Sequence, residues 1–264
     1  MERITATGGV FFRAEDPEPR VEKVTIATVD GPMDAYVARP AAPGRGPALV
    51  VAQEAFGVNE HIRDVCRRFA RAGYVAIAPE IFHRAGRGLE IPYGNMEPAM
   101  AQLALLTNDG IETDLAAALD YARGDSEVDA WRVGLVGFCI GGFVAFLGAC
   151  RLDPAATVSF YGGGIVRARQ GMLIEPLLDE ADAIDAPLLC LFGSEDGGIP
   201  AADVDAIRAR LETRGIGGEV VVYEGAKHAF FCDMRPNFHP AAAARAWEKT
   251  LAWCERYVRG SVRS

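Results

Sequence analysis

Short apolar runs alternate with helical patterns along most of the chain. An alternating, β-branched segment at 21–29 predicts a strand, Asp30-Gly31 predicts a turn, and 33–39 follows as a hairpin partner. The later apolar runs are continuous, which is typical of strands buried on both faces of a sheet. They predict strands at 48–52, 74–78, 132–136, 156–161, 186–192 and 218–223.

Helical spacing of apolar residues separates these strands. In 59–72, Ile62, Val65 and Phe69 fall on one helical face, and Gly73 ends the pattern. Strands that alternate with helices predict an α/β protein with a mostly parallel, doubly wound sheet, helices on both faces and an antiparallel N-terminal edge. The helices are predicted at 59–72, 109–123, 140–150, 201–212 and 239–258.

Two segments depart from this alternation. Residues 1–20 end in the charged sequence E-D-P-E-P-R and are interpreted as an N-terminal extension, so that 21–264 form a single domain. Residues 83–108 contain Arg, Gly, Pro and Asn without periodicity, and we expect them to be irregular and to shape a pocket mouth. Sheets of this kind bind ligands beyond the carboxyl ends of their strands, so candidate chemistry is sought there.

Composition and charge narrow the function classes. The chain has 264 residues, 50% hydrophobic and 24% charged, which suits a globular protein with its own core. A net charge of -9 without a dense Lys/Arg run argues against nucleic-acid and membrane partners. No signal pattern or bilayer-length apolar run stands out, and the six scattered cysteines form no C-x-x-C. We therefore expect a cytoplasmic protein with reduced thiols; its oligomeric state stays open.

A thiol between two glycines forms the most unusual turn. Cys139 follows an apolar strand and precedes a helix, in the pattern Gly137-x-Cys139-x-Gly141. A nucleophile elbow has this strand–turn–helix arrangement and a strained backbone. The helix N-terminus favours a thiolate, and the N–H of Ile140 points where an oxyanion would form. The alternative is a small apolar residue packed in a tight turn.

An elbow nucleophile needs a base and an orienting acid, which follow it in the chain order nucleophile, acid, base. Asp196 follows a late strand in G-S-E-D-G-G-I-P, and His228 follows the next one in E-G-A-K-H-A-F-F. Glu195 is a rival for the acid, and a helix cap is the structural alternative. The other three histidines are interpreted as surface or capping residues: His61, His83 and His239.

The loop after the first buried strand carries a further carboxylate. Glu54 lies in Q-E-A-F-G-V at the same rim as the elbow, where it could contact the thiol and change its ionisation. A solvated loop glutamate is the ordinary alternative. The backbone N–H of Ala55 would supply a second oxyanion donor.

Six separated segments together resemble the dienelactone hydrolase family of the α/β-hydrolase superfamily. They are Q-E-A-F-G-V-N (53–59), P-E-I-F-H-R (79–84), G-F-C-I-G-G (137–142), Y-G-G-G-I (161–165), G-S-E-D-x-x-I-P (193–200) and H-A-F-F-C-D-x-R-P (228–236). The resemblance spans roughly residue 21 to the C-terminus. It implies an α/β-hydrolase fold, no cofactor and hydrolysis of a small ester or lactone through a thiol acyl-enzyme. The implied triad is Cys139, Asp196 and His228, with Glu54 as the thiol's partner.

The resemblance also implies that Arg84 binds a substrate carboxylate. A guanidinium can hold a carboxylate bidentately, although a lone loop arginine is more often solvated. The family's second carboxylate-binding arginine, four residues after the catalytic histidine, is replaced here by Cys232. Arg235 lies close by but out of register. This departure concerns the substrate rather than the hydrolytic chemistry.

Three other functions remain as alternatives. The chain could be a general small-molecule carboxylesterase, a non-catalytic ligand-binding member of the fold, or a thiol-redox protein if Cys232 lies near Cys139 in space. A metal site is not expected, because His228, Cys232, Asp233 and His239 match no zinc spacing.

Overall fold

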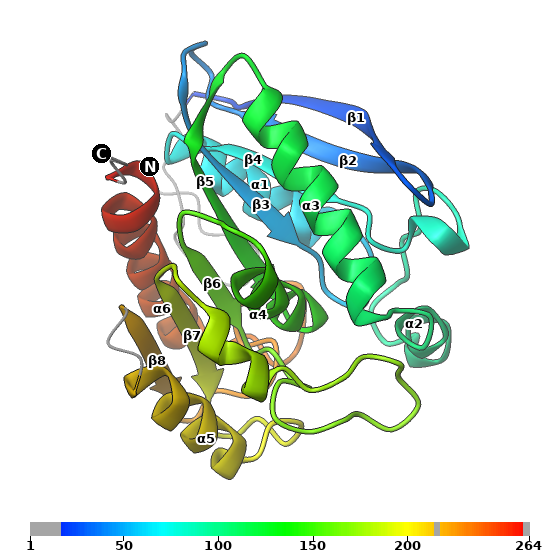
Figure 1. Ribbon diagram of the computed structural model, residues 1–264, viewed down its shortest axis with the longest axis vertical. Coiled ribbons are helices and arrows are strands. Elements are labelled where there is room, and N and C mark those ends of the chain that lie inside the picture. Colours follow the sequence, from blue (N-terminus) through cyan, green and yellow to red (C-terminus); the bar gives the residue numbers. More distant parts are fainter. Residues whose placement is uncertain (1–16, 214–216, 261–264) are drawn as a thin grey trace.

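Eight strands form one mixed sheet in the computed structural model, which describes residues 17–213 and 217–260. The spatial order is β1-β2-β4-β3-β5-β6-β7-β8 (Figure 1). β1 and β2 pair antiparallel, β2 pairs antiparallel with β4, and every other neighbouring pair is parallel. The strands are β1 (Arg20–Thr28), β2 (Gly31–Arg39), β3 (Gly46–Ala52), β4 (Val75–Pro79), β5 (Val128–Phe138), β6 (Thr157–Phe160), β7 (Leu188–Gly193) and β8 (Gly218–Tyr223).

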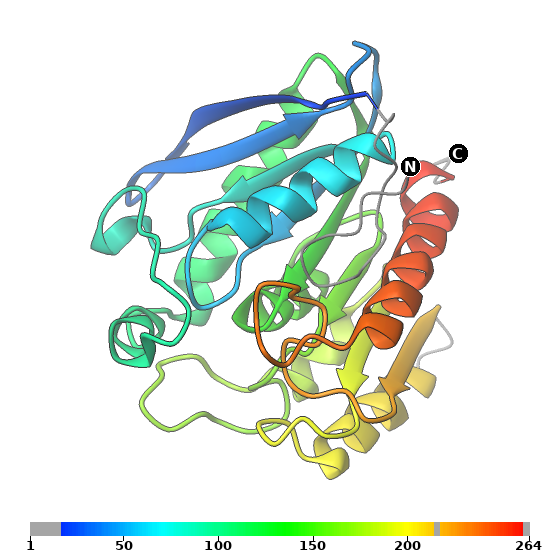
Figure 2. The ribbon, with the colours of Figure 1, turned by 180° about the vertical axis from the view of Figure 1, so that it is seen from behind.

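Helices cover both faces of this sheet. Helices α3 and α4 lie on the face seen in Figure 1, and α1 and α6 lie on the face seen in Figure 2. The expected doubly wound α/β architecture with an antiparallel N-terminal edge is therefore confirmed. The α-helices are α1 (Glu60–Arg71), α2 (Met96–Leu103), α3 (Asn108–Gly124), α4 (Ile140–Arg151), α5 (Ala201–Glu212) and α6 (Pro240–Cys254).

Helix α1 shows why the spacing of apolar residues in 59–72 predicted a helix correctly. Asn59 caps its N-terminus by accepting a hydrogen bond from the Ile62 N–H at 3.3 Å. Ile62, Val65 and Phe69 are all fully buried, so the predicted apolar stripe is the face that packs on the sheet. Arg68 and Arg71 lie in the last turn, where positive charge complements the helix dipole.

The prediction of a fully irregular 83–108 segment is wrong. It contains a short 3-10 turn, η1 (His83–Ala85), and helix α2. Only Ala99 and Leu103 of α2 are buried, so its apolar stripe is too narrow to give a helical signal. A second 3-10 segment, η2 (Leu178–Ala183), lies between β6 and β7.

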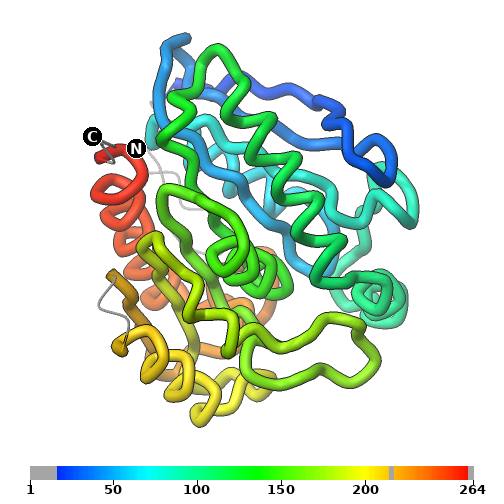
Figure 3. Tube along the Cα trace, in the orientation of Figure 1, coloured from blue at the N-terminus to red at the C-terminus, as the bar shows by residue number. Residues whose placement is uncertain are grey.

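The ends of the chain differ slightly from expectation. β1 begins at Arg20, inside the predicted N-terminal extension, whose residues 1–16 lie outside the described part of the chain. The last α-helix ends at Cys254 and continues as a π-helical turn, η3 (Glu255–Arg259). The tube in Figure 3 follows the chain from the β1 edge in blue to α6 in red.

The central part of the sheet is fully buried. Leu49, Val50 and Val51 of β3 and Val136 of β5 have no exposed surface. The parallel strands β3, β5, β7 and β8 end at one edge of this sheet, so the loops that follow them start from rigid positions. Among the described residues, no helix combines the length and apolar character that crossing a bilayer requires.

Candidate active site

The turn between β5 and α4 has the geometry of a strained elbow. Cys139 adopts φ 59° and ψ -118°, a left-handed backbone that L-residues rarely occupy. A Cβ on Gly137 would lie 1.8 Å from the carbonyl oxygen of Gly141, and a Cβ on Gly141 would lie 2.3 Å from that of Ala52. Both positions therefore require glycine, because backbone from β3 and α4 occupies the space.

The structure brings the three predicted triad residues into contact. The His228 Nε2 atom lies 3.2 Å from the Cys139 sulfur, and His228 Nδ1 lies 2.7 Å from Asp196 Oδ2. The second oxygen of Asp196 accepts a hydrogen bond from the Gly198 N–H at 2.9 Å, and this carboxylate is buried. These contacts fix the ring between an acceptor and a sulfur, the arrangement a nucleophile–base–acid relay needs.

Charges around His228 favour its protonated form. Burial by itself lowers the pKa of His228, but the Cys139 sulfur and the Asp196 carboxylate outweigh it and raise that pKa well above its usual range. The imidazolium then places a positive charge 3.2 Å from the Cys139 sulfur. The pair lies at the N-terminus of α4, whose dipole adds to the effect.

The two predicted oxyanion donors lie at the same rim. Ile140 is the first residue of α4, so its N–H has no acceptor within the helix. Ala55 is buried directly beyond β3, and the end of β3 abuts Gly141 of the elbow. The Ile140 N–H thus belongs to the Cys139 turn, and the Ala55 N–H belongs to the loop after β3, the strand whose end contacts that turn.

Glu54 is buried, not solvated. Its Oε2 accepts a hydrogen bond from the Tyr93 hydroxyl at 3.2 Å, and its Oε1 lies 3.7 Å from the Arg235 guanidinium. Arg235 also rests over the rings of Phe56 and Tyr93. Within the described residues the carboxylate makes no hydrogen bond to Cys139, and its contact with the thiol stays a prediction.

Tyr93 and Arg235 are the residues that the sequence argument did not place. Tyr93 lies in the 83–108 segment, whose lack of periodicity gave no position for its side chain. Arg235 stood out only as a cation near the missing family position. Its contact with Glu54 shows that it supplies positive charge to this carboxylate from a different point in the loop.

Arg84 lies in an ion-pair cluster with partners outside the triad. Its Nε and Nη2 donate to Asp30 at 2.9 and 2.6 Å, and its Nη1 donates to the buried Asp114 at 2.6 Å. These partners come from the β1–β2 hairpin and from α3. A substrate carboxylate would have to replace Asp30, the more exposed of the two.

The three histidines outside the proposed triad are interpreted from the sequence as surface or capping residues. His239 caps α6 by accepting from the Ala242 N–H at 3.2 Å, as expected. The surface or capping interpretation of His61 and His83 is wrong, because both side chains are buried. His83 bonds the buried Asp114 at 3.0 Å, whereas His61 faces Glu54 and Cys232. A lone histidine in a helical pattern carries no signal for such tertiary packing.

A small cavity of about 230 Å³ adjoins the loop that carries Asp196. Its wall includes the backbone of Gly162, Gly163 and Gly198, and the side chain of Arg169. The Arg169 guanidinium donates a hydrogen bond to the Gly198 carbonyl at 2.9 Å. A positively charged side chain therefore contacts the loop that carries Asp196.

Comparisons with known proteins identify the family to which this chain is similar. A family model described as "Dienelactone hydrolase family" matches residues 33–258. A Synechocystis sp. protein named "Putative carboxymethylenebutenolidase" is 41% identical over 228 residues, covering 86% of this chain and 92% of that protein. A Bradyrhizobium sp. protein named "Probable 2-oxo-3-(5-oxofuran-2-ylidene)propanoate lactonase" is 32% identical over 226 residues, covering 86% and 90%.

A solved structure with a related sequence has a similar fold. The crystal structure titled as a putative dienelactone hydrolase from Klebsiella pneumoniae superposes with a TM-score of 0.81 at 34% identity, covering 90% of this chain and 99% of that one. The family match begins within β2 and ends within η3, so it includes Cys139, Asp196 and His228.

Proposed function

The chain belongs to the dienelactone hydrolase family, and from this membership we propose that it hydrolyses small lactones or esters with Cys139 as the nucleophile. The observation that carries the proposal is the pair of contacts made by His228, 3.2 Å to the Cys139 sulfur and 2.7 Å to Asp196. A thiol, a base and an orienting carboxylate at these distances support an acyl-transfer mechanism.

The first half of the reaction opens the lactone. The Cys139 thiolate attacks the carbonyl carbon, and the carbonyl π electrons move to oxygen. The N–H groups of Ile140 and Ala55 hold this oxyanion. When the carbonyl re-forms, the ring C–O bond breaks, and the departing oxygen takes the proton of the His228 imidazolium. The product is a thioester on Cys139 that still carries the released enol or alcohol.

The second half releases the acid. His228, now neutral, accepts a proton from water as the water oxygen attacks the thioester carbonyl. The same two N–H groups hold the second oxyanion, and the C–S bond breaks to return Cys139 to thiolate and His228 to imidazolium. Asp196 keeps the ring oriented throughout, because its bond to Nδ1 leaves Nε2 facing the sulfur.

Enol lactones fit this chemistry better than amides. A thiolate is a good nucleophile and a good leaving group, so the first tetrahedral intermediate collapses forward only if the departing oxygen leaves at least as well as sulfur. An enolate meets this condition, whereas an amide nitrogen does not. The two relatives reported above carry the names "Putative carboxymethylenebutenolidase" and "Probable 2-oxo-3-(5-oxofuran-2-ylidene)propanoate lactonase", and both names refer to an unsaturated lactone as the substrate.

A substrate of this class carries a carboxylate, and we assign its binding to Arg84. The Nε and Nη2 atoms of Arg84 both donate to one oxygen of the half-exposed Asp30, and a substrate carboxylate that replaces Asp30 could use this edge bidentately. The bonds from Nη1 and Nη2 to the two oxygens of Asp114 would keep the guanidinium in place. Glu54, whose carboxylate lies between Tyr93 and Arg235, is assigned the role of thiol partner.

Hydrolysis of an enol lactone with a carboxylate arm, and of a neutral aryl ester, tests the proposal. The wild type should open the lactone and form one acyl or alkyl adduct per chain, located on Cys139. Cys139→Ala should lose at least about 10³-fold in kcat, because the nucleophile is removed. Cys254→Ala, at a buried cysteine of α6, is the matched control and should keep full activity.

Two results would reject the assignment. Full lactone hydrolysis by Cys139→Ala would exclude this cysteine as the nucleophile. Ester hydrolysis by the wild type without any action on lactones would place the chain among general carboxylesterases.

A further inference from the structure

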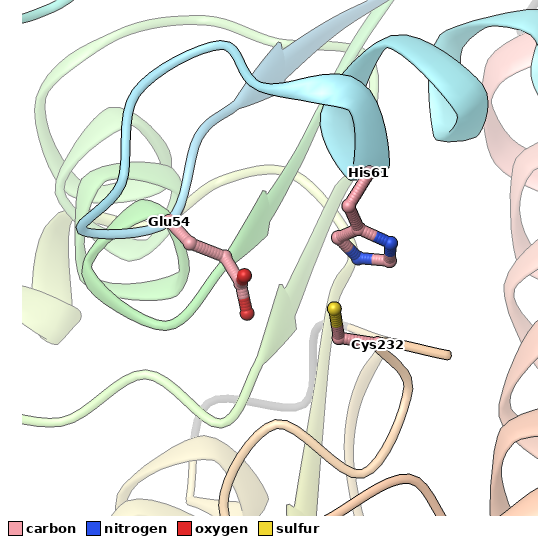
Figure 4. Close-up of side chains that lie close together, drawn as sticks. All are labelled: Glu54, His61 and Cys232. Atoms are coloured by element: carbon pink, nitrogen blue, oxygen red, sulfur yellow. The ribbon is translucent and has the colours of Figure 1, made fainter. Parts of the chain in front are cut away.

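Three buried side chains with metal-binding atoms face one another. They are Glu54 after β3, His61 in the first turn of α1, and Cys232 in the loop after β8 (Figure 4). One donor atom from each lies within 4.8 Å of the other two. Figure 4 shows the carboxylate, a ring nitrogen and the sulfur directed into the same space. The chain thus brings three kinds of ligand together, two from the segment that joins β3 to the start of α1 and one from the loop after β8.

The burial of this cluster leaves polar atoms without hydrogen-bond partners. Glu54, His61 and Cys232 each have 0% exposed surface. Within the described residues, both ring nitrogens of His61 and Oε1 of Glu54 form no hydrogen bond. An unsatisfied buried polar atom costs about 1–3 kcal/mol, so these three together call for a ligand.

The donor set matches one class of ligand. A thiolate, an imidazole and a carboxylate are the groups that bind zinc and similar borderline-soft divalent cations. We propose that Glu54, His61 and Cys232 form a binding site for one divalent cation of this class, with Zn²⁺ as the best fit. Donors on one tetrahedral zinc lie about 3.5 Å apart, so a spacing of up to 4.8 Å closes with small side-chain rotations.

The surroundings of His61 support a ligand role. Its Nδ1 lies 3.8 Å from Asp233 Oδ1, which leaves Nε2 as the nitrogen for the metal. Asp233 is itself held by a hydrogen bond from Arg68 at 2.9 Å. A carboxylate behind the second ring nitrogen is the usual way in which proteins orient a metal-binding histidine.

Charge in the cluster also suits a divalent cation, with one competitor. Glu54 and a Cys232 thiolate would supply two negative charges, and the Tyr93 hydroxyl, 3.3 Å from the Cys232 sulfur, is a neutral neighbour. The Arg235 guanidinium lies 3.7 Å from Glu54 Oε1 and would be repelled by the metal. Arg235 therefore competes with the cation for this carboxylate.

The test uses Co²⁺ as the probe in a Cys139→Ala background, which removes the triad thiol as a second metal ligand. The full chain is expressed in Co²⁺-supplemented medium, because a buried site loads most readily during folding. Metal content is measured by mass spectrometry, and thiolate-to-Co²⁺ charge-transfer absorption reports the sulfur ligand. The readout is independent of hydrolysis, so failure of the proposed function would not affect it.

The parent should contain close to one Co²⁺ per chain and show the charge-transfer band. Cys232→Ser and His61→Gln in this background should each lose both, whereas Cys254→Ser, at a buried cysteine outside the cluster, should keep both. Arg235→Gln should bind Co²⁺ more tightly than the parent, since the competing cation is gone. Circular dichroism checks that each variant is folded. If Cys232→Ser does not fold, the metal content of His61→Gln tests the proposal instead.

A parent without bound Co²⁺ would overturn the proposal. Co²⁺ that stays in both Cys232→Ser and His61→Gln would also overturn it, because the metal would then sit elsewhere.

Discussion

The Nε2 atom of His228 lies 3.2 Å from the sulfur of Cys139, although the two residues are 89 positions apart in the chain. The contact exists because β5 and β8 run in the same direction in one sheet and release their loops at the same edge. Asp196 completes it from the loop after β7, which pairs with β8. The parallel sheet therefore brings these three side chains together.

Cys139 should be alkylated quickly at pH 6. The pKa of His228 is raised by the neighbouring sulfur and Asp196 against the effect of burial, so an imidazolium remains beside the sulfur well above pH 6. A free thiol is less than about 1% ionised at that pH, so His228→Gln should slow iodoacetamide labelling of Cys139 by about 10²-fold. Mass spectrometry of the labelled peptide measures the rate at each site.

The remaining cysteines and a surface variant are the controls for this labelling. Burial raises the pKa of the Cys66, Cys190 and Cys254 thiols, which should react slowly at every pH tested. Lys227→Gln, next to His228 but exposed, should label like the wild type. Uniformly slow labelling of all six cysteines would mean that no thiolate is stabilised at the elbow and would favour a binding module.

Asp196 should be the acid of the relay, and Glu195 should not. Asp196 is buried with both oxygens engaged by His228 and Gly198, whereas Glu195 is exposed. Asp196→Asn should lower kcat by about 10²–10⁴-fold because the ring loses its orientation. Glu195→Gln should change kcat less than twofold. Steady-state lactone hydrolysis measures both, and a larger loss in the Glu195 variant would reverse the assignment.

The elbow should not tolerate a methyl group at Gly137. A Cβ there would lie 1.8 Å from the Gly141 carbonyl oxygen, and neither backbone can move without disturbing β3. Gly137→Ala should lower the free energy of unfolding by more than about 3 kcal/mol, measured by urea denaturation. Gly44→Ala, where a Cβ meets nothing within 4 Å, should change it by less than about 0.5 kcal/mol. Equal stability of the two variants would contradict the close approach.

Much of this arrangement follows from local sequence. The β5–Cys139–α4 turn was predictable because its glycines, its apolar strand and its apolar helix are contiguous, and strand ends in a parallel sheet share an edge. Asp196 and His228 were placeable for the same reason, since each directly follows a strand. These predictions needed order along the chain and no knowledge of distant contacts.

The rest depended on tertiary packing that no local pattern encodes. His61 is fully buried because Phe138 and Phe231 pack around it, which its place in a helical stripe could not reveal. Tyr93 reaches Glu54 from a segment without periodicity. Arg84 was expected at a substrate carboxylate from a resemblance, and its pairing with Asp30 and Asp114 involves elements far away in sequence.

Arg84 should discriminate between acidic and neutral substrates. Arg84→Lys keeps a cation beside the buried Asp114 but cannot bind a carboxylate bidentately. Its KM for the carboxylate-bearing lactone should rise about 10-fold or more, with little change for a neutral aryl ester. Asp30→Asn should lower the KM for the acidic lactone, because it removes the competing carboxylate. Michaelis–Menten measurements with both substrates test the pair.

Arg87→Lys is the matched control for Arg84→Lys. Arg87 belongs to the same loop and pairs with Asp34, so its change should leave both KM values as in the wild type. Parallel changes for the acidic and neutral substrates in Arg84→Lys would show that Arg84 acts on the fold and does not bind a carboxylate.

The buried Asp233 should make stability depend on pH in the acid range. Burial acts to raise the pKa of Asp233, but His61 and Arg68 outweigh it and lower that pKa to about 2. An unfolded aspartate titrates near 3.9, so the stabilisation from this carboxylate is complete above about pH 4 and is lost as the pH falls through 2. Asp233→Asn should destabilise the protein by about 2 kcal/mol above pH 5, and the difference from wild type should shrink by pH 2.5.

Urea unfolding at several pH values measures this difference in the free energy of unfolding, with Asp205→Asn, at an exposed helical aspartate, as the control. Because other carboxylates titrate in both proteins, the prediction concerns only the difference between them, and a difference that stays constant from pH 6 to 2.5 would mean that His61 and Arg68 do not hold Asp233 ionised.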